Sequence, residues 1–193
     1  LDVLTPLAKS WPSQWSQESI SLAIQIHGGY GYTRDYNVEQ FYRDNRLNPI
    51  HEGTHGIQAI DLLGRKVTMQ GGAGLQLLLA TVRATIARAN AIQANAAESG
   101  ALQQHAAALE QAFARIEQTT RILHSGGDAT LTLANATLYL EAMGHAVIAW
   151  IWLEQMLVAH GKSGDFYAGK RQAAQYFFRW ELPKIYPQLT LLE

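Results

Sequence analysis

The sequence predicts an all-α protein, an antiparallel up-and-down helical bundle followed by additional bundled helices. Apolar residues recur at helical spacing along most of the 193 residues, and no run alternates with the period of a strand. Glycine pairs separate the helical stretches at short intervals. Amphipathic helices joined by short turns bury their apolar stripes best by packing antiparallel to one another.

The first predicted helix has its apolar stripe at i, i+3, i+4 and i+7 over residues 20–27. It ends at Gly28, because glycine adopts the left-handed conformation of a helix stop without strain. A loop is expected over residues 30–35 and a short helix over 37–46. Pro49 disfavours helix at the residue before it. The next helix is therefore expected to begin near Glu52 and to run to about residue 70.

The composition changes at Gly71-Gly72, where alanine-rich helices replace a mixture of glycines, aromatics and charges. We therefore expect two units, residues 1–70 and residues 71–193. The second unit should contain one helix from about residue 75 to near Gly100, and another over 102–123 whose apolar positions alternate steps of three and four, which is typical of a bundle or coiled-coil seam. Asp128 should cap a helix that runs to about residue 160, and a last helix should cover 165–180. Pro183 and Pro187 should leave an irregular tail.

The most apolar stretch, residues 131–160, is predicted to be a buried core helix rather than a membrane span. Charged residues and a histidine interrupt it, and its longest charge-free run is shorter than the about 20 residues that a bilayer requires. His145 lies within the apolar stripe, so we expect a hydrogen-bonded core histidine.

Charge and cysteine content exclude several classes of protein. A formal net charge of −1 provides no electrostatic footprint for nucleic acid, and the absence of cysteine excludes disulfides and thiol catalysis. The absence of cysteine fits a reducing compartment, so we expect a cytoplasmic protein. The chain starts on a leucine in the middle of a pattern, which favours a piece of a longer protein.

Residues 51–55 match the zinc-protease pattern H-E-x-x-H. On a helix, His51 and His55 would share one face, and Glu52 could act as general base on a zinc-bound water. That motif needs a continuous helix, however, and Pro49 and Gly53 both disfavour one here. We therefore favour a site without metal.

A second interpretation of Glu52 comes from an ordered set of motifs. Residues 25–32 read QIHGGYGY, and Val38-Glu39, Arg43-Asp44 and residues 50–54 (IHEGT) follow in order. This order and spacing resemble the C-terminal helical domain of the FAD-dependent acyl-CoA dehydrogenases. The run from residue 48 to 67 is similar to the subgroup that includes 3-methylmercaptopropionyl-CoA dehydrogenase, whose members carry an extra helical region at the C-terminus; residues 71–193 resemble that region in placement.

The resemblance implies an oxidoreductase that introduces an α,β double bond into an acyl-CoA thioester. Glu52 would be the base that removes the α-proton, and FAD would accept the β-hydride. Gly53 would lie against the acyl-CoA. The residues that would approach the FAD are Gln25, Ile26, His27, Gly28, Gly29 and Thr54. The implied partners are upstream domains of the same polypeptide, further copies in a homodimer or homotetramer, and an electron-transfer flavoprotein or similar acceptor.

Two alternatives belong to other classes. The seam over residues 102–123 and the aromatic C-terminus would also suit a non-catalytic helical oligomerisation module. A nucleic-acid-associated relative would be expected to carry a basic C-terminal region, which the balanced charge does not supply.

Overall fold

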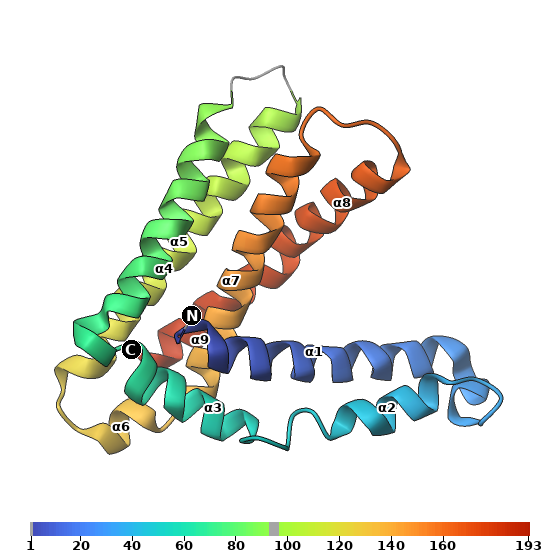
Figure 1. Cartoon of the computed structure of the whole chain (residues 1–193), viewed down its shortest axis with the longest axis horizontal. Coiled ribbons are helices and arrows are strands. Elements are labelled where there is room, and N and C mark those ends of the chain that lie inside the picture. The colour runs from blue at the N-terminus through green and yellow to red at the C-terminus, as the bar shows by residue number, and fades with distance from the viewer. Residues whose placement is uncertain (1, 93–96) are drawn as a thin grey trace.

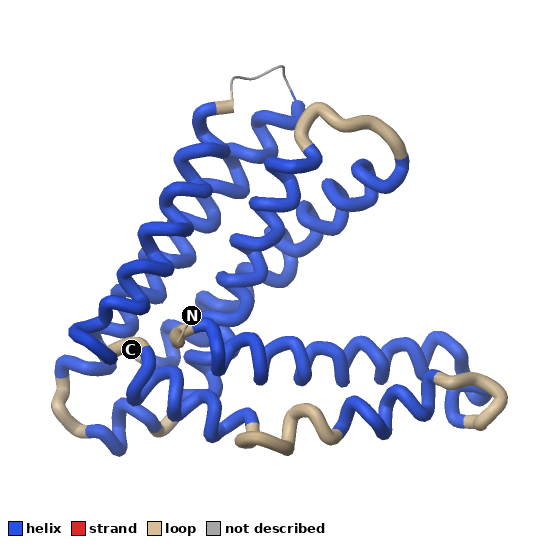
Figure 2. Tube along the Cα trace, viewed as in Figure 1, coloured by secondary structure: helices blue, strands red, loops and turns tan. Residues whose placement is uncertain are grey.

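The computed structural model describes residues 2–92 and 97–193, apart from the side chains of residues 97–99, and this part of the chain consists of helices and turns without a strand (Figure 2). The all-α prediction is therefore confirmed. In chain order the elements are α1 (Leu4–His27), the 3₁₀ helix η1 (Gly28–Tyr32), α2 (Val38–Arg46), α3 (His55–Asp61), the π-helical η2 (Leu62–Lys66), α4 (Met69–Ala91), α5 (Ala97–Ser125), α6 (Ala129–Leu133), α7 (Ala136–Ala159), α8 (Asp165–Tyr176), the π-helical η3 (Phe177–Glu181), the 3₁₀ helix η4 (Leu182–Lys184) and α9 (Ile185–Leu192).

The helices form two arms that meet at one end of the molecule (Figure 1). Helices α1 and α2 pair as a hairpin that projects from the rest of the chain. Helices α4, α5, α7 and α8 form the second arm, and α3 and α9 lie where the arms join. Helix α7 connects the arms, because it packs against α5, α8 and α9 and also contacts α1 and α3.

Helix α7 is the core helix that the sequence predicts. Its length and composition would allow it to cross a membrane, but 56% of its most apolar window is buried inside the protein. His145 is 1% exposed, and its Nδ1 lies 2.9 Å from the carbonyl oxygen of Glu141. The prediction of a hydrogen-bonded core histidine is confirmed.

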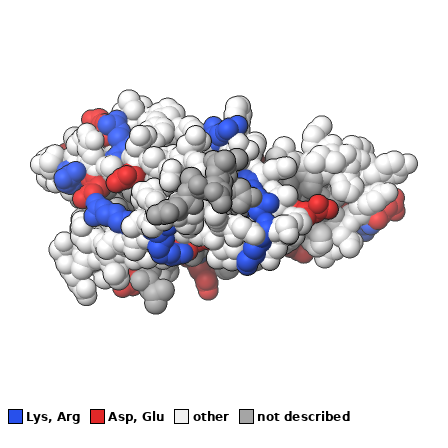
Figure 3. All heavy atoms as spheres, turned by 90° about the horizontal axis from the view of Figure 1, so that it is seen from above, with Lys and Arg blue, Asp and Glu red and all other residues white. Residues whose placement is uncertain are grey.

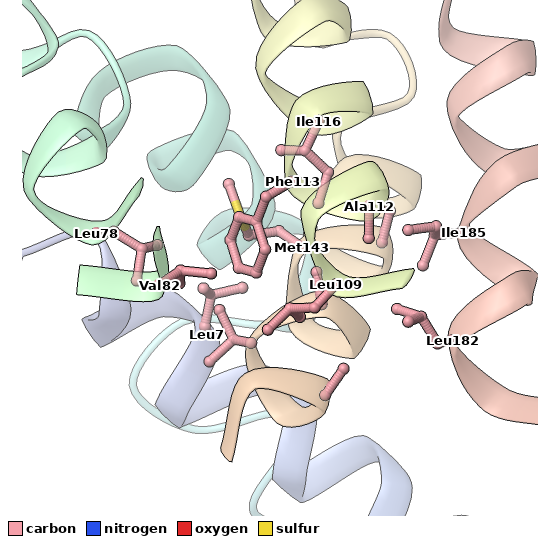
Figure 4. Packing of buried hydrophobic residues seen from close by; sticks show 14 of the residues in the cluster. Leu7, Leu78, Val82, Leu109, Ala112, Phe113, Ile116, Met143, Leu182 and Ile185 are labelled. Carbon is pink, nitrogen blue, oxygen red and sulfur yellow. The ribbon is translucent and has the colours of Figure 1, made fainter. Parts of the chain in front are cut away.

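The seam over residues 102–123 is buried within the chain. Leu109 and Phe113 of α5 point toward Met143 of α7 and toward Leu78 and Val82 of α4 (Figure 4). Burial of one leucine-sized side chain stabilises a fold by about 1.5–3 kcal/mol, so this seam holds three helices of one chain together. The seam therefore packs against helices of the same chain. It no longer argues for an oligomerisation module, for which the aromatic C-terminus was the other observation.

Several helix ends lie where the sequence places them. Gly28 ends α1 with φ 60°, and Gly161 follows α7 with φ 70°. The Asp128 side chain accepts hydrogen bonds from the amides of Thr130 (2.8 Å) and Leu131 (3.3 Å), as expected of an N-cap. Gly71-Gly72 adopts left-handed backbone and interrupts the helix assigned to α4.

Other boundaries differ from the prediction. Residues 28–32 form the 3₁₀ helix η1 rather than only a loop. Helix α4 already ends at Ala91. Gly100 lies inside α5, because a glycine without left-handed backbone is no stop signal. The helix expected over residues 128–160 breaks into α6 and α7 at Asn135, where ψ is 34°.

The expected irregular tail is helical. Pro183 lies in the first turn of η4, and Pro187 lies in the first turn of α9. Amides in a first helical turn have no intrahelical partner, so a proline there costs no hydrogen bond. The prediction was wrong because it read each proline as a helix breaker.

Charged side chains of both signs lie on one face of the molecule. On the face that Figure 3 shows, Lys and Arg side chains lie beside Asp and Glu side chains, with uncharged surface between them. This face therefore carries both signs of charge, in keeping with the formal net charge of −1.

Candidate functional site

Glu52 lies in a tight turn between α2 and α3. The amides of Ile50 and His51 both donate to the carbonyl oxygen of Leu47, at 2.9 and 3.1 Å, and reverse the chain after α2. Glu52 then has φ 54°, a left-handed value that is rare for a residue with a side chain, and Gly53 has φ 92°. Such a conformation costs of the order of 1–3 kcal/mol and persists only where its surroundings enforce it.

Side chains from two helices hold this turn. The carbonyl oxygen of Glu52 accepts from Nε2 of Gln58 at 3.0 Å, and that of Gly53 accepts from Nζ of Lys9 at 2.5 Å. Thr54 caps α3, since its Oγ1 accepts from the amide of Ile57 at 3.5 Å. The two carbonyls that follow the strained residue are thus both bound by side-chain donors.

The helix expected to begin near Glu52 begins instead at His55. The side chain of Glu52 is exposed to solvent, and no other residue in the described part of the chain hydrogen-bonds its carboxylate. An exposed, unpaired carboxylate on a rigid turn can take a proton from a molecule placed against it. The backbone amide of Glu52 belongs to the same turn.

The two histidines of residues 51–55 lie in separate environments. His51 is exposed, and its Nδ1 lies 3.0 Å from the carbonyl oxygen of Leu47. His55 is half-buried in the first turn of α3, and its Nδ1 lies 2.5 Å from Oγ of Ser10. The left-handed residues between them break the helix that a zinc-protease motif requires. Among the residues that the structure describes, no group of three or more His, Cys, Asp or Glu side chains is arranged to hold a metal ion.

Burial lowers the pKa of His55 below its usual range. The nearby carboxylate of Glu141 opposes this shift, and the ammonium of Lys9 adds to it. His55 is therefore neutral near pH 7, and its ring accepts from or donates to Ser10 without adding a charge beside Glu52.

The expected flavin contacts lie at the far tip of the α1–α2 hairpin. Gln25 to Gly29 are all exposed where α1 ends, and the Ile26 side chain is 84% exposed. Lys9 contacts the Glu52 turn, and it lies on α1 sixteen residues before Gln25. At the rise of an α-helix this places the tip roughly 24 Å from the turn along the axis. Of the expected flavin contacts, the structure brings only Thr54 together with Glu52.

Gly28 and Gly29 have no atoms within 4 Å of the position where a side chain would start. Their backbone is therefore uncovered, and it fits a group laid directly against it. Since α1 ends here, the helix dipole presents its negative end, so contact with an anionic group at this tip would depend on close approach rather than on charge.

The sequence also indicates an Arg43-Asp44 motif, but Arg43 forms its ion pair with Glu39, one helical turn earlier. Residues next to each other on a helix point in different directions, whereas residues four apart lie on one face. Lys9, Ser10 and Gln58 were missed altogether. The two contacts from α1 cross 44 and 45 residues of sequence, and no local pattern announces such pairs.

Two sequence models of one enzyme family match the chain. The model described as "Acyl-CoA dehydrogenase, C-terminal domain" matches residues 2–68, and the one described as "Acetyl-CoA dehydrogenase C-terminal like" matches residues 78–193.

Curated relatives cover the chain as a whole. It is 32% identical over 181 residues to 3-methylmercaptopropionyl-CoA dehydrogenase of Ruegeria pomeroyi. This alignment covers 91% of the chain and 30% of the relative. The chain is 26% identical over 208 residues to the broad-specificity linear acyl-CoA dehydrogenase FadE5 of Mycobacterium tuberculosis, covering 100% of this chain and 33% of the relative. A shorter match, 45% identical over 58 residues, joins 30% of the chain to 15% of the caffeyl-CoA reductase-Etf complex subunit CarC of Acetobacterium woodii. The chain spans about a third of the length of the first two relatives. The chain belongs to the acyl-CoA dehydrogenase family and matches the C-terminal helical region of that family.

Proposed function

We propose that this chain supplies the C-terminal helical part of an FAD-dependent acyl-CoA dehydrogenase in which Glu52 removes the α-proton of the thioester. The observation that carries the proposal is the turn itself: a left-handed glutamate with a free carboxylate, held through two consecutive carbonyls. Strained residues of this kind cluster at functional sites.

In the proposed reaction the carboxylate of Glu52 takes the α-proton of the acyl group. The electrons of the broken Cα–H bond form the double bond to Cβ. The hydrogen on Cβ leaves as hydride, with both electrons of the Cβ–H bond. FAD, when bound, supplies the acceptor for that hydride. The backbone amide of Glu52 donates to the thioester carbonyl oxygen and stabilises the negative charge that develops there. Gly53 gives the acyl-CoA close access to this backbone.

The proposal assigns the flavin contacts of this chain to the hairpin tip and to Thr54. Gln25, Ile26 and His27 are exposed beside the uncovered Gly28-Gly29 backbone. Because the tip lies far from Glu52, we assign its contacts to an FAD held mainly by another subunit of a homodimer or homotetramer. Upstream domains of the polypeptide would supply the remaining flavin and acyl-CoA contacts.

The electron acceptor and the location belong to the same proposal. The relative from Acetobacterium woodii is named as a subunit of a complex with Etf. We propose an electron-transfer flavoprotein or similar acceptor here as well, and a cytoplasmic location for a chain without cysteine.

Exchange of the substrate's α-proton tests the assignment. The complete enzyme is incubated with acyl-CoA in D₂O without an electron acceptor, and deuterium at the α-carbon is followed by NMR. The wild type should incorporate deuterium, and Glu52→Gln should not, because an amide cannot accept the proton. Glu18→Gln, an exposed glutamate of α1, serves as the control. Incorporation by Glu52→Gln at the wild-type rate would refute the role of Glu52.

A further inference from the structure

The two carbonyls that follow Glu52 are fixed by donors of different origin. Gln58, which binds the carbonyl of Glu52, lies on α3 only six residues away and moves with the turn. Lys9, which binds the carbonyl of Gly53, belongs to α1 and lies 44 residues away. Lys9 is therefore the contact that fixes the turn relative to another part of the fold.

The stretch of α1 around Lys9 is itself firmly placed. Ser10 is 1% exposed and bonds the His55 ring. Trp11 follows, and its ring lies where a side chain at Gly144 of α7 would start, while its Nε1 lies 3.3 Å from Nδ1 of His145. Three consecutive residues of α1 thus connect the Glu52 turn, helix α3 and the core helix α7.

We infer that Lys9 is a positioning residue for proton abstraction, and this inference rests on the proposed role of Glu52. The ammonium of Lys9 fixes the Gly53–Thr54 peptide and so limits rotation of the preceding Glu52–Gly53 peptide. That peptide determines where the Cα–Cβ bond of Glu52 points. Without the bond, the strained turn can relax, and the carboxylate spends less time in line with the α-carbon.

The test uses the complete enzyme with Lys9→Met, which keeps the length of the side chain and removes the donor. The readouts are the rate constant of flavin reduction by acyl-CoA, the dissociation constant for acyl-CoA, the FAD content and the kinetic isotope effect of α-deuterated substrate. Lys9→Arg keeps a cationic donor. Lys162→Met is the matched control, because Lys162 is exposed and lies in the turn between α7 and α8.

We expect Lys9→Met to slow flavin reduction by about 10–100-fold, since small misplacements of reacting groups cost that much. FAD content and acyl-CoA affinity should stay unchanged, and the α-deuterium isotope effect should rise, because proton removal becomes more rate-limiting. Lys9→Arg should recover most of the rate, and Lys162→Met should match the wild type. A purely structural role for Lys9 would instead lower FAD content or affinity and leave the isotope effect unchanged, which would overturn the inference.

The two proposals can fail separately. If Glu52→Gln abolishes flavin reduction while Lys9→Met reduces flavin at the wild-type rate, the positioning role is wrong and the role of Glu52 stands. If Glu52→Gln reduces flavin normally, both are wrong. Should Lys9→Met not accumulate as holoenzyme, Lys9→Leu, which also lacks a donor, replaces it in the same comparison, with the same two outcomes.

Discussion

Single residues determine the site through backbone conformation rather than through charge. A side chain at Gly53 would begin 2.9 Å from Nε2 of Gln58, and φ there is 92°, so glycine is the residue that suits this position. The motif predicts a glutamate before a glycine, and it gives no sign that the glutamate itself is left-handed. That strain results from contacts with Lys9 and Gln58, which become visible only in the folded chain.

Two glycines should respond in opposite ways to alanine. A methyl group at Gly144 would overlap the Trp11 ring, and Gly169, inside α8, has open space around it. Gly144→Ala should lower the free energy of unfolding by about 1–3 kcal/mol through overpacking. Gly169→Ala should raise it by about 1 kcal/mol through helix propensity. Urea unfolding of the two variants measures both effects, and a Gly144→Ala protein as stable as Gly169→Ala would contradict the close approach of α1 and α7.

His105 should make the fold sensitive to acid. It is 6% exposed and stacked on Phe178 at 4.2 Å, and burial, assisted by the charge of Arg179, lowers its pKa to about 4. The unfolded chain binds a proton below pH about 6.5, whereas the folded chain does so only near pH 4. The free energy of unfolding should therefore fall by roughly 2–3 kcal/mol between these pH values.

His105→Phe keeps a flat ring against Phe178 and removes the titration. Stability measured by urea unfolding from pH 7 to pH 4 should depend less on pH in this variant. His27→Phe, which replaces an exposed histidine, is the control and should retain the acid sensitivity of the wild type. An unchanged pH profile in His105→Phe would show that His105 is not the group responsible.

At the scale of elements, a polar cluster fixes α4 against α7. Nε1 of Trp150 donates to Oγ1 of Thr85 at 2.8 Å, and Thr85 in turn donates to Oε1 of Glu154 at 2.6 Å. Arg88 pairs with both oxygens of that carboxylate at 2.9 Å. Burial alone would raise the pKa of Glu154, but the hydrogen bonds from Arg88 and Thr85 outweigh it and lower the pKa below its usual value.

Thr85→Val should destabilise the protein by about 1–3 kcal/mol, because it leaves the Trp150 N–H without its acceptor. Thr85→Ser keeps the hydroxyl and should cost less. A depressed carboxylate pKa contributes stability above the unfolded pKa of 4.5 and loses it as the pH falls through the folded value. Glu154→Gln should therefore be less stable than the wild type at pH 7, and this difference should shrink on acidification in thermal unfolding scans. A difference that grew in acid would contradict the assignment.

Most helices could be predicted because their apolar spacing and glycine stops are local signals. The C-terminal end of α1 and the cap of α6 follow from Gly28 and Asp128 themselves. The break at Asn135 could not be predicted, because the apolar pattern continues across it. The helical tail could not be predicted either, since a proline is compatible with the first turn of a helix and incompatible with later ones. In the site, the motif order predicts Glu52, whereas its partners on α1 depend on tertiary packing.

At the scale of the whole molecule, the seam of α5 faces inward and the hairpin tip faces outward. Leu22 and Tyr32, like Ile26, are large apolar side chains that the described fold leaves more than half exposed. The proposed enzyme would cover part of this tip with FAD held by another subunit. Surface that is functional rather than structural should tolerate substitution in the isolated fold.

Ile26→Asp tests this division. Because Ile26 is 84% exposed, the substitution should lower the free energy of unfolding of the chain by no more than about 1 kcal/mol, the cost of an acidic residue at the C-terminal end of a helix. In the complete enzyme it should weaken FAD binding by about tenfold, which is equivalent to 1.4 kcal/mol. Leu191→Asp, on α9 with 68% exposure, should leave FAD binding unchanged. Flavin retention after dialysis measures the effect, and equal retention in the two variants would remove the tip from the flavin site.

The most direct measurement is the single-turnover reduction of bound flavin by acyl-CoA, followed without oxygen at the flavin's visible absorption. Glu52→Gln is compared with the wild type, and Glu18→Gln is the control. With Glu52 as the base, the rate constant for Glu52→Gln should fall by at least about 100-fold, the lower range of general-base catalysis, while FAD content is retained. Reduction of flavin by Glu52→Gln at the wild-type rate would contradict the account.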